Sequence, residues 1–119
     1  MDRRLLGRWG EEQAARYLRR RGYTILGMNY GCRFGEIDII AKKRGFVVFA
    51  EVKLRKDAAF AQAREFVTRA KQERVIAAAE LWMSQNETGL QPRFDVIEIY
   101  APEGTSGKIK IEHIENAFP

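Results

Sequence analysis

Acidic and basic side chains that could do chemistry together fall in two neighbouring segments of the sequence. Residues 36–40 read Glu-Ile-Asp-Ile-Ile, and residues 49–53 read Phe-Ala-Glu-Val-Lys. Because the side chains of a β-strand alternate between its faces, Asp38 and Glu51 each lie among apolar neighbours, and Lys53 shares a face with Glu51. An ionised carboxylate in such surroundings is costly unless it is paired, hydrogen-bonded or bound to a cation. Both acids therefore require a partner.

The spacing of the two segments predicts that the two acids face each other. Residues 43–45, Lys-Arg-Gly, are typical of a hairpin turn. If Arg44 and Gly45 alone form the loop, Asp38 falls opposite Glu51, about 5 Å away; another loop length would shift this register. Two carboxylates that close repel each other. A bridging Mg²⁺ or Mn²⁺ would relieve the repulsion and leave coordination positions for water and a phosphate oxygen.

Lys53 adds a positive charge to the same strand face, about 6.6–6.8 Å beyond Glu51. In phosphodiester hydrolysis, a charge there would lower the pKa of the attacking water or offset the charge that develops on the phosphate oxygens. The alternative is a solvent-facing salt bridge between Glu51 and Lys53 on an ordinary strand. The apolar run at 46–50 weighs against that alternative, because it predicts a strand buried on both faces.

A third acid lies on the helix predicted over residues 3–21. On a helical wheel, Glu11 shares a face with small or apolar residues: Gly7, Ala14, Ala15 and Leu18. Glu12 is four residues from both Arg8 and Arg16, so it is expected in solvent. Small neighbours would let the helix approach the sheet and bring Glu11 to the cation as a third oxygen ligand. The competing explanation is a buried acid that caps backbone amides.

The rest of the sequence predicts the elements that must position these side chains. We expect one α/β domain over residues 1–119, in the order α-β-β-β-α-β-β, with a mixed central sheet flanked by helices. Gly22 can end the first helix. The predicted strands cover residues 23–30, 36–42, 46–54, 94–100 and 108–114.

A helical stretch is predicted between the third and fourth strands, since no Gly or Pro occurs there before Gly89. Asp57 can cap a short first piece and Thr68 a longer second one. The tail is expected to dock through Phe118. Residues at helical spacing should face the core: Val75, Ile76, Ala79, Trp82 and Met83.

The composition indicates a soluble protein with a polyanionic partner. The formal charge is +5, and residues 1–44 hold eleven Lys or Arg against five acids. No apolar run approaches the ~20 residues of a membrane span, and the start lacks a signal-peptide core, so the cytoplasm is the expected compartment. Cys32 is the only cysteine, which excludes an internal disulfide. We expect it to be half-buried.

Seven motifs follow one another along the chain: Gly7-x-x-Gly10-Glu11-x-x-Ala14, Gly22-Tyr23-x-Ile25-Leu26-x-x-Asn29, Phe34-Gly35-Glu36-Ile37-Asp38-x-Ile40-Ala41, Val48-Phe49-x-Glu51-Val52-Lys53, Lys71-Gln72, Arg93-Phe94-Asp95 and Asn116-Ala117-Phe118. In this order they resemble the bacterial YraN-like family of predicted endonucleases over nearly the whole chain. That family is similar to the restriction-endonuclease-like PD-(D/E)xK nuclease superfamily and, within it, to archaeal Holliday junction resolvases. The resemblance implies a site of Glu11, Asp38, Glu51 and Lys53, in which the three acids hold Mg²⁺ or Mn²⁺.

Some positions depart from the pattern or admit two interpretations. Ile37 stands where the superfamily has a proline, and Phe60-Ala61 stands where Phe-Gly is expected. The resemblance implies that Lys71 and Gln72 approach the site or a backbone phosphate; a solvated helix pair is the alternative.

Four further polar positions are given no catalytic role. Glu36 could orient the site, but a structural role is preferred. Arg93 and Asp95 are expected to form an ion pair that steadies a strand, and His113 is expected at the surface.

These observations favour a metal-dependent endonuclease acting on DNA rather than RNA, with branched or flapped structures among its candidate substrates. The alternative is a catalytically silent nucleic-acid-binding adaptor in DNA processing or uptake. A homodimer would suit cleavage of both strands. The residues expected to contact nucleic acid are Arg8, Arg33, Lys42, Lys43, Arg44, Arg55, Lys71 and Gln72.

Overall fold

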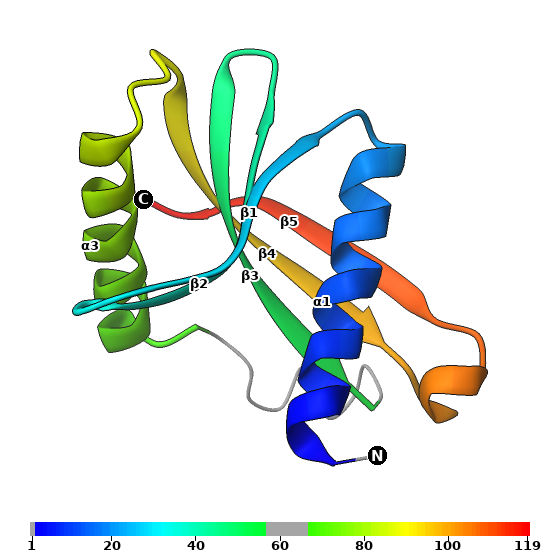
Figure 1. Ribbon diagram of the computed structural model, residues 1–119. Coiled ribbons are helices and arrows are strands. Elements are labelled where there is room, and N and C mark those ends of the chain that lie inside the picture. Colours follow the sequence, from blue (N-terminus) through cyan, green and yellow to red (C-terminus); the bar gives the residue numbers. More distant parts are fainter. Residues whose placement is uncertain (1, 57–66) are drawn as a thin grey trace.

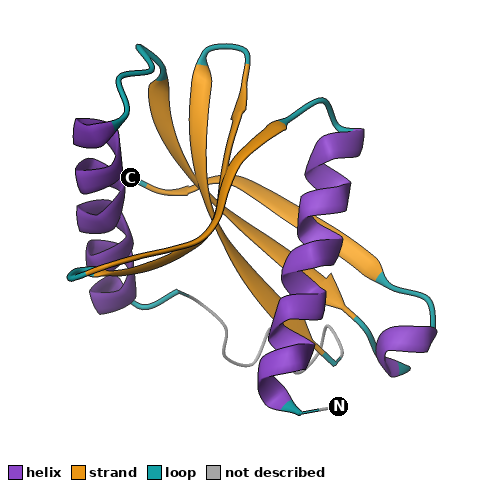
Figure 2. Ribbon diagram, in the orientation of Figure 1, coloured by secondary structure: helices purple, strands orange, loops and turns teal. Residues whose placement is uncertain are grey.

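Two helices lie on opposite faces of a five-stranded sheet in the computed structural model, which describes residues 2–56 and 67–119 (Figure 1). The predicted order α-β-β-β-α-β-β is confirmed, with one added 3-10 turn (Figure 2). The short helical piece predicted from Asp57 lies outside the described residues. The elements are α1 (Arg3–Arg20), β1 (Thr24–Cys32), β2 (Gly35–Lys43), β3 (Phe46–Arg55), α3 (Arg69–Gln85), β4 (Gln91–Tyr100), η1 (Gly104–Ser106) and β5 (Lys110–Phe118).

The sheet is mixed, as predicted. Its strands follow the order β1-β2-β3-β4-β5. β3 and β4 run parallel, and the other neighbouring pairs are antiparallel. A parallel pair needs a crossover connection, and the segment between β3 and β4 includes α3. This connection brings α3 onto the sheet face opposite α1 (Figure 1).

Each face of the sheet has its own hydrophobic cluster. The cluster beneath α3 comprises Ile37, Ile40, Val47, Phe49, Val75, Ala78, Ala79, Trp82, Phe94, Val96 and Phe118. The cluster beneath α1 comprises Ala14, Ala15, Leu18, Tyr23, Ile39, Ala41, Val48, Ala50, Ile97 and Ile99. Ile76, Met83 and the half-buried Cys32 pack against the first cluster, as expected. Because β3 contributes alternate residues to both clusters, it is buried on both faces.

Local hydrogen bonds define both ends of α1. The Asp2 carboxylate accepts a hydrogen bond from the Leu5 amide at 2.9 Å and caps the first turn. At the other end, Gly22 adopts a positive φ of 90°, and its amide bonds to Arg19 while the Tyr23 amide bonds to Leu18. This Schellman motif confirms Gly22 as the residue that ends the helix. No helix in the described ranges is long and apolar enough to cross a bilayer.

The hairpin between β2 and β3 has the two-residue loop that the sequence favoured. Lys43 pairs with Phe46 across the loop, and Arg44 adopts a left-handed φ of 55°. Primed turns of this kind match the twist of the flanking strands. The ladder continues from Lys43 to Ile39, which pairs with Ala50. The predicted register is therefore confirmed up to the position next to Asp38 and Glu51.

The last strand is longer than predicted. The expected strand over 108–114 begins at Lys110 and continues to Phe118, because a register shift between Phe94 and Val96 lets pairing with β4 resume after Ile114. Phe118 is buried and stacks on Phe94 with ring centroids 5.2 Å apart. The expected docking through Phe118 is thus confirmed, although it occurs at the end of a strand.

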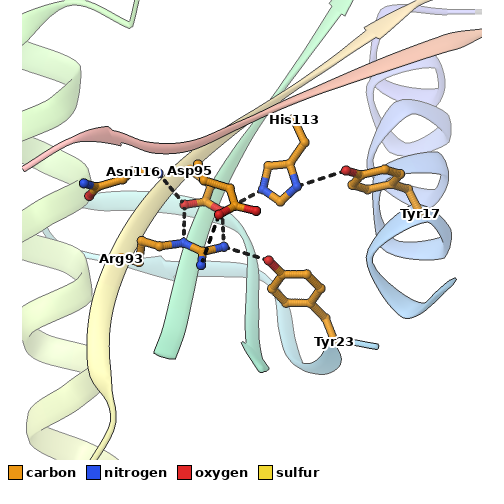
Figure 3. A network of polar contacts seen from close by, with 7 residues as sticks. Tyr17, Tyr23, Arg93, Asp95, His113 and Asn116 are labelled. Atoms are coloured by element: carbon orange, nitrogen blue, oxygen red, sulfur yellow. Dashed lines mark hydrogen bonds and ion pairs between the residues drawn. The ribbon is translucent and has the colours of Figure 1, made fainter. Parts of the chain in front are cut away.

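A buried polar network joins α1 to β4 and β5 (Figure 3). Asp95 is completely buried and accepts hydrogen bonds from Arg93 at 2.9 and 2.7 Å and from the Asn116 amide at 3.0 Å. His113 Nε2 lies 2.7 Å from Asp95, and His113 Nδ1 lies 3.1 Å from the Tyr17 hydroxyl. The prediction of an Arg93–Asp95 ion pair is confirmed.

The expectation that His113 lies at the surface is wrong. Its side chain is only 6% exposed although it belongs to an edge strand. Tyr17 from α1 contacts the ring edge-on with centroids 5.5 Å apart, and Tyr23 lies 6.1 Å from it. Tyr17 of α1 and Tyr23, which follows the end of the helix, therefore cover the part of β5 that holds His113.

Candidate functional site

Asp38 and Glu51 meet where the ladder between β2 and β3 stops. The last paired residues are Ile39 and Ala50, and beyond them the Val52 amide donates to Asp38 Oδ2 at 2.8 Å. The Asp38 side chain thus takes the place of a backbone acceptor on β2. The two acids stand as neighbours at the point where the strands separate.

Glu51 is a buried carboxylate with only part of its bonding capacity used. Its side chain is 3% exposed, and Oε1 lies 3.4 Å from the Lys71 ammonium of α3. Within the described residues, the buried Oε2 has no hydrogen-bond partner. A carboxylate oxygen in this state is costly, because burial removes its hydration without replacing it. The unsatisfied oxygen is what a site that accepts a cation would present.

Burial raises the pKa values of both acids. Burial, followed by the charge of Glu51, raises the pKa of Asp38 to about 7, and Glu11 adds a smaller contribution. Burial also raises the pKa of Glu51, against the opposing effects of Lys71, a hydrogen bond from the Asp38 backbone, and Lys53. The pair therefore favours either a shared proton or a nearby cation at neutral pH.

Two lysines accompany the pair. Lys71 pairs with Glu51 directly, whereas Lys53 lies two residues further along β3 and acts on Glu51 through its charge. Gln72 does not reach this pair with its amide, which donates to the Val67 carbonyl at 2.8 Å. Of the two helix positions singled out in the sequence, only Lys71 contacts an acid of the site.

Glu11 lies beside the pair rather than within it. Its Oε1 accepts a hydrogen bond from the Asn29 side chain at 2.8 Å. Asn29 stands opposite Asp38, since Met28 pairs with Ile39 and Tyr30 pairs with Ile37. The influence of Glu11 on the pKa of Asp38 places all three side chains in one electrostatic neighbourhood.

Asn29 is a member of this neighbourhood to which the sequence analysis assigned no role. It has a left-handed φ of 51° within β1, a conformation that asparagine tolerates better than most residues. The sequence offers one indication of a special role for Asn29: it lies within a predicted strand, where asparagine is uncommon.

The donor set suits a hard divalent cation in part. Asp38 and Glu51 supply carboxylate oxygens, the ligands that Mg²⁺ and Mn²⁺ prefer. Across residues 2–56 and 67–119, no group of three or more acidic, histidine or cysteine side chains is gathered so as to hold a metal ion. The carboxylates that could hold a cation are thus those of the two strand acids, with Glu11 adjacent.

Some of the side chains expected to bind nucleic acid are exposed to solvent, and others contact an aromatic ring of the protein. Arg8, Lys42 and Arg44 are exposed. The Arg33 guanidinium lies over the Phe34 ring at 4.8 Å, and the Lys43 ammonium lies over the Tyr23 ring at 5.0 Å.

Arg55 and Glu36 lie apart from the acid pair. Arg55 Nε lies 3.7 Å from the Glu98 carboxylate on β4, and the Arg55 side chain is mostly buried. Glu36, for which we preferred a structural role, is exposed at the start of β2.

Comparison with known proteins assigns the chain to a family. It is 40% identical over 119 residues to a UPF0102 protein of Caldanaerobacter subterraneus subsp. tengcongensis, covering 99% of this chain and 98% of the relative. It is 43% identical over 120 residues to one from Pelobacter propionicus, covering 98% and 84%. A relative from Flavobacterium psychrophilum is 37% identical over 113 residues, covering 95% and 92%. Residues 10–99 match the sequence model of the uncharacterised protein family UPF0102, and the chain belongs to this family.

Proposed function

We propose that this protein is a metal-dependent nuclease that hydrolyses phosphodiester bonds in DNA, with Mg²⁺ or Mn²⁺ as its cofactor. The observation that supports this most is the buried, unpartnered Oε2 of Glu51 beside Asp38, as seen among the described residues. A merely structural acid would have its oxygens satisfied within the fold. The resemblance to the YraN-like family of predicted endonucleases favours the same activity.

Each residue has a distinct role in this proposal. Asp38 and Glu51 would hold the cation, which when bound supplies Lewis-acid activation of water and of the phosphate. Lys53 offsets negative charge on the phosphate oxygens during hydrolysis. Lys71 neutralises Glu51 when no cation is present, which explains how the buried Glu51 is tolerated beside the half-buried Asp38 in the folded chain. Glu11, held by Asn29, would complete the acidic neighbourhood.

Basic side chains provide the attraction for DNA. The chain carries a formal charge of +5, and Arg8, Lys42 and Arg44 are exposed. Contacts of this type bind phosphates without reading sequence. Because the resemblance extends to archaeal Holliday junction resolvases, branched and flapped DNA are the first substrates to test, alongside linear duplex.

The test is a cleavage assay with purified protein on linear, flapped and four-way-junction DNA in EDTA, Mg²⁺ and Mn²⁺. We expect cleavage only with a divalent cation. Asp38→Asn and Glu51→Gln should each reduce the rate by about 10³-fold, since they remove several kcal/mol of stabilisation at about 1.4 kcal/mol per decade. Lys53→Met should reduce the rate by about 10²-fold.

Glu112→Gln is the matched control, because Glu112 is an exposed acid on β5. It should retain the wild-type rate. Cleavage that persists in EDTA, or that survives equally in Asp38→Asn and Glu51→Gln, would contradict the proposal.

A nucleic-acid-binding adaptor without activity is the second candidate. Two observations favour it: Lys71 already neutralises Glu51, and the described residues hold no ready group of three metal-binding side chains. An adaptor would bind DNA in all conditions and cleave in none. Absence of cleavage by a folded, DNA-binding preparation would therefore select this candidate.

A further inference from the structure

A cleft of about 510 Å³ opens at the end of the sheet away from the acid pair. Its walls are the start of β1, the β2–β3 turn and the connection from α3 to β4, which lie together at the upper end of the molecule in Figure 1. The volume is in the range of sites that hold one small organic ligand, about 300–1,000 Å³. A single nucleotide fits this size, and a base-paired duplex does not.

The cleft combines cations with an apolar surface. Lys42, Lys43 and Arg44 line it, and Glu87 is the one acid among the described residues of its lining. Leu26 and Leu90 also line it, and Leu26 is 38% exposed although it is a large apolar residue.

Cations and leucines suit the two parts of a nucleotide. The cations suit phosphate groups, and the leucine side chains offer an apolar contact to the face of a base. The excess of positive charge favours a polyanion over a neutral or cationic ligand.

We infer that this cleft binds an unpaired nucleotide of the substrate, with its base against Leu26 and Leu90 and its flanking phosphates near Lys42 and Arg44. An unpaired base can present its face to a side chain, whereas inside a duplex both faces are stacked on neighbouring base pairs. The inference rests on the proposed function and deepens it. It assigns the substrate class as nucleic acid with a single-stranded flap or tail.

The position of the cleft relative to the acid pair fits this class. Lys42 is four residues from Asp38 along β2, which corresponds to about 13 Å at ~3.3 Å per residue. A strand held at Asp38 would therefore have to extend about 13 Å along β2 to enter the cleft.

The experiment measures binding in EDTA, by fluorescence anisotropy, of three labelled probes of equal length: oligothymidylate, its abasic counterpart and a duplex. Wild type should bind oligothymidylate more tightly than the abasic strand. Leu26→Ala should reduce oligothymidylate binding to the abasic level and leave duplex binding unchanged. Lys42→Ala with Arg44→Ala should lower the slope of log affinity against log salt by about 0.7 for each phosphate of the single strand that is no longer neutralised.

The double variant Lys108→Ala with Lys110→Ala is the charge-matched control, because both lysines are exposed at the opposite edge of the sheet. It should leave the preference for oligothymidylate over the abasic strand unchanged. An equal weakening in the control, or equal binding of oligothymidylate and abasic probes by wild type, would overturn the inference. Circular dichroism establishes that each variant is folded.

Binding and cleavage fail separately in this design. If the cleft binds oligothymidylate as expected but no cleavage is found, the proposed nuclease activity is refuted and the binding role of the cleft stands. If cleavage depends on the metal but the Leu26→Ala variant binds oligothymidylate as tightly as wild type, the binding role of the cleft is refuted and the nuclease activity stands.

Discussion

Two buried acidic regions lie on adjacent strands and have opposite chemical character. Asp95 on β4 pairs in register with Ala50 on β3, and Glu51 is the next residue along. Burial alone would raise the pKa of Asp95, but hydrogen bonds from His113, Arg93 and the Asn116 backbone outweigh it and lower the pKa. Hydrogen bonds and lysine charges offset the burial of Asp38 and Glu51 only in part, and their pKa values are raised.

The difference teaches how to separate structural acids from functional candidates in this sheet. Both regions are buried, so burial does not distinguish them. Asp95 has donors for both oxygens (Figure 3), whereas Glu51 has one buried oxygen with no partner in the described part of the chain. A satisfied acid stabilises the fold, and an unsatisfied one is retained at a cost that function can explain.

The largest effect on stability is expected from breaking the satisfied region. Asp95→Ala should lower the free energy of unfolding by about 3–5 kcal/mol, since it leaves the buried Arg93 without its carboxylate. Urea denaturation followed by circular dichroism measures this change. Glu112→Ala, at an exposed position, is the control and should change the stability by less than about 0.5 kcal/mol. A loss of similar size in both variants would remove the contrast between the regions.

The next largest effect is expected from supplying a cation to the unsatisfied region. Mn²⁺ at about 100 times its Kd should raise the free energy of unfolding by about 2.7 kcal/mol. The melting temperature in a Mn²⁺ titration reports it without any cleavage. The Glu51→Gln variant should lose this stabilisation, and Asp95→Asn should keep it. An equal response in wild type and Glu51→Gln would place the cation elsewhere.

A smaller effect should distinguish the two regions by pH. Asp38 holds its proton more tightly in the folded chain, with a pKa of about 7 against an ordinary 3.8, so its contribution is fully present at low pH and is lost as the pH rises through about 7. Asp38→Asn should therefore stabilise the protein by about 1–2 kcal/mol above pH 7.

The same substitution should have little effect near the ordinary pKa of aspartate. Asp95 has the opposite dependence: with a lowered pKa, its contribution is present above the ordinary value and is lost as the pH falls. Unfolding curves across the pH range measure both slopes. A stabilisation by Asp38→Asn that is independent of pH would contradict the assigned pKa.

The smallest effect concerns the outer end of the satisfied network. Tyr17→Phe removes the hydroxyl that contacts His113 Nδ1 but keeps the ring that packs on it. The expected loss is about 1 kcal/mol, the usual net value of one hydrogen bond. Comparison with Tyr30→Phe, whose hydroxyl contacts Gln85 in an exposed setting, provides the control. A Tyr30→Phe loss as large as that of Tyr17→Phe would show that burial of the network adds nothing.

Most of the fold could be predicted because its signals are local. The glycine after Arg21 defined the end of α1, and Thr68 was recognised as the cap of α3, where its hydroxyl accepts from the Lys71 amide. The Arg44-Gly45 loop determined which residues of β2 and β3 pair, and hence that Asp38 and Glu51 are neighbours. Each of these features depends on a few consecutive residues.

The features that were wrong or unassigned depend on contacts between distant segments. His113 is buried because α1 packs over β5, about a hundred residues away in the chain, and nothing near His113 in the sequence encodes that. Asn29 gained its role from the approach of Glu11. Arg55 is engaged by Glu98 only because β3 and β4 run parallel. The candidate site was thus predictable in its strand acids and not in its surroundings.

The parallel pairing of β3 and β4 also determines when Glu51 becomes enclosed during synthesis, because α3 and β4 are made after β3. The β2–β3 hairpin can form soon after residue 55 emerges from the ribosome, since its contacts are local. Lys71 and the neighbouring strand that encloses Glu51 are made later, and that strand ends at Tyr100. Glu51 therefore becomes fully enclosed only after translation has passed that residue.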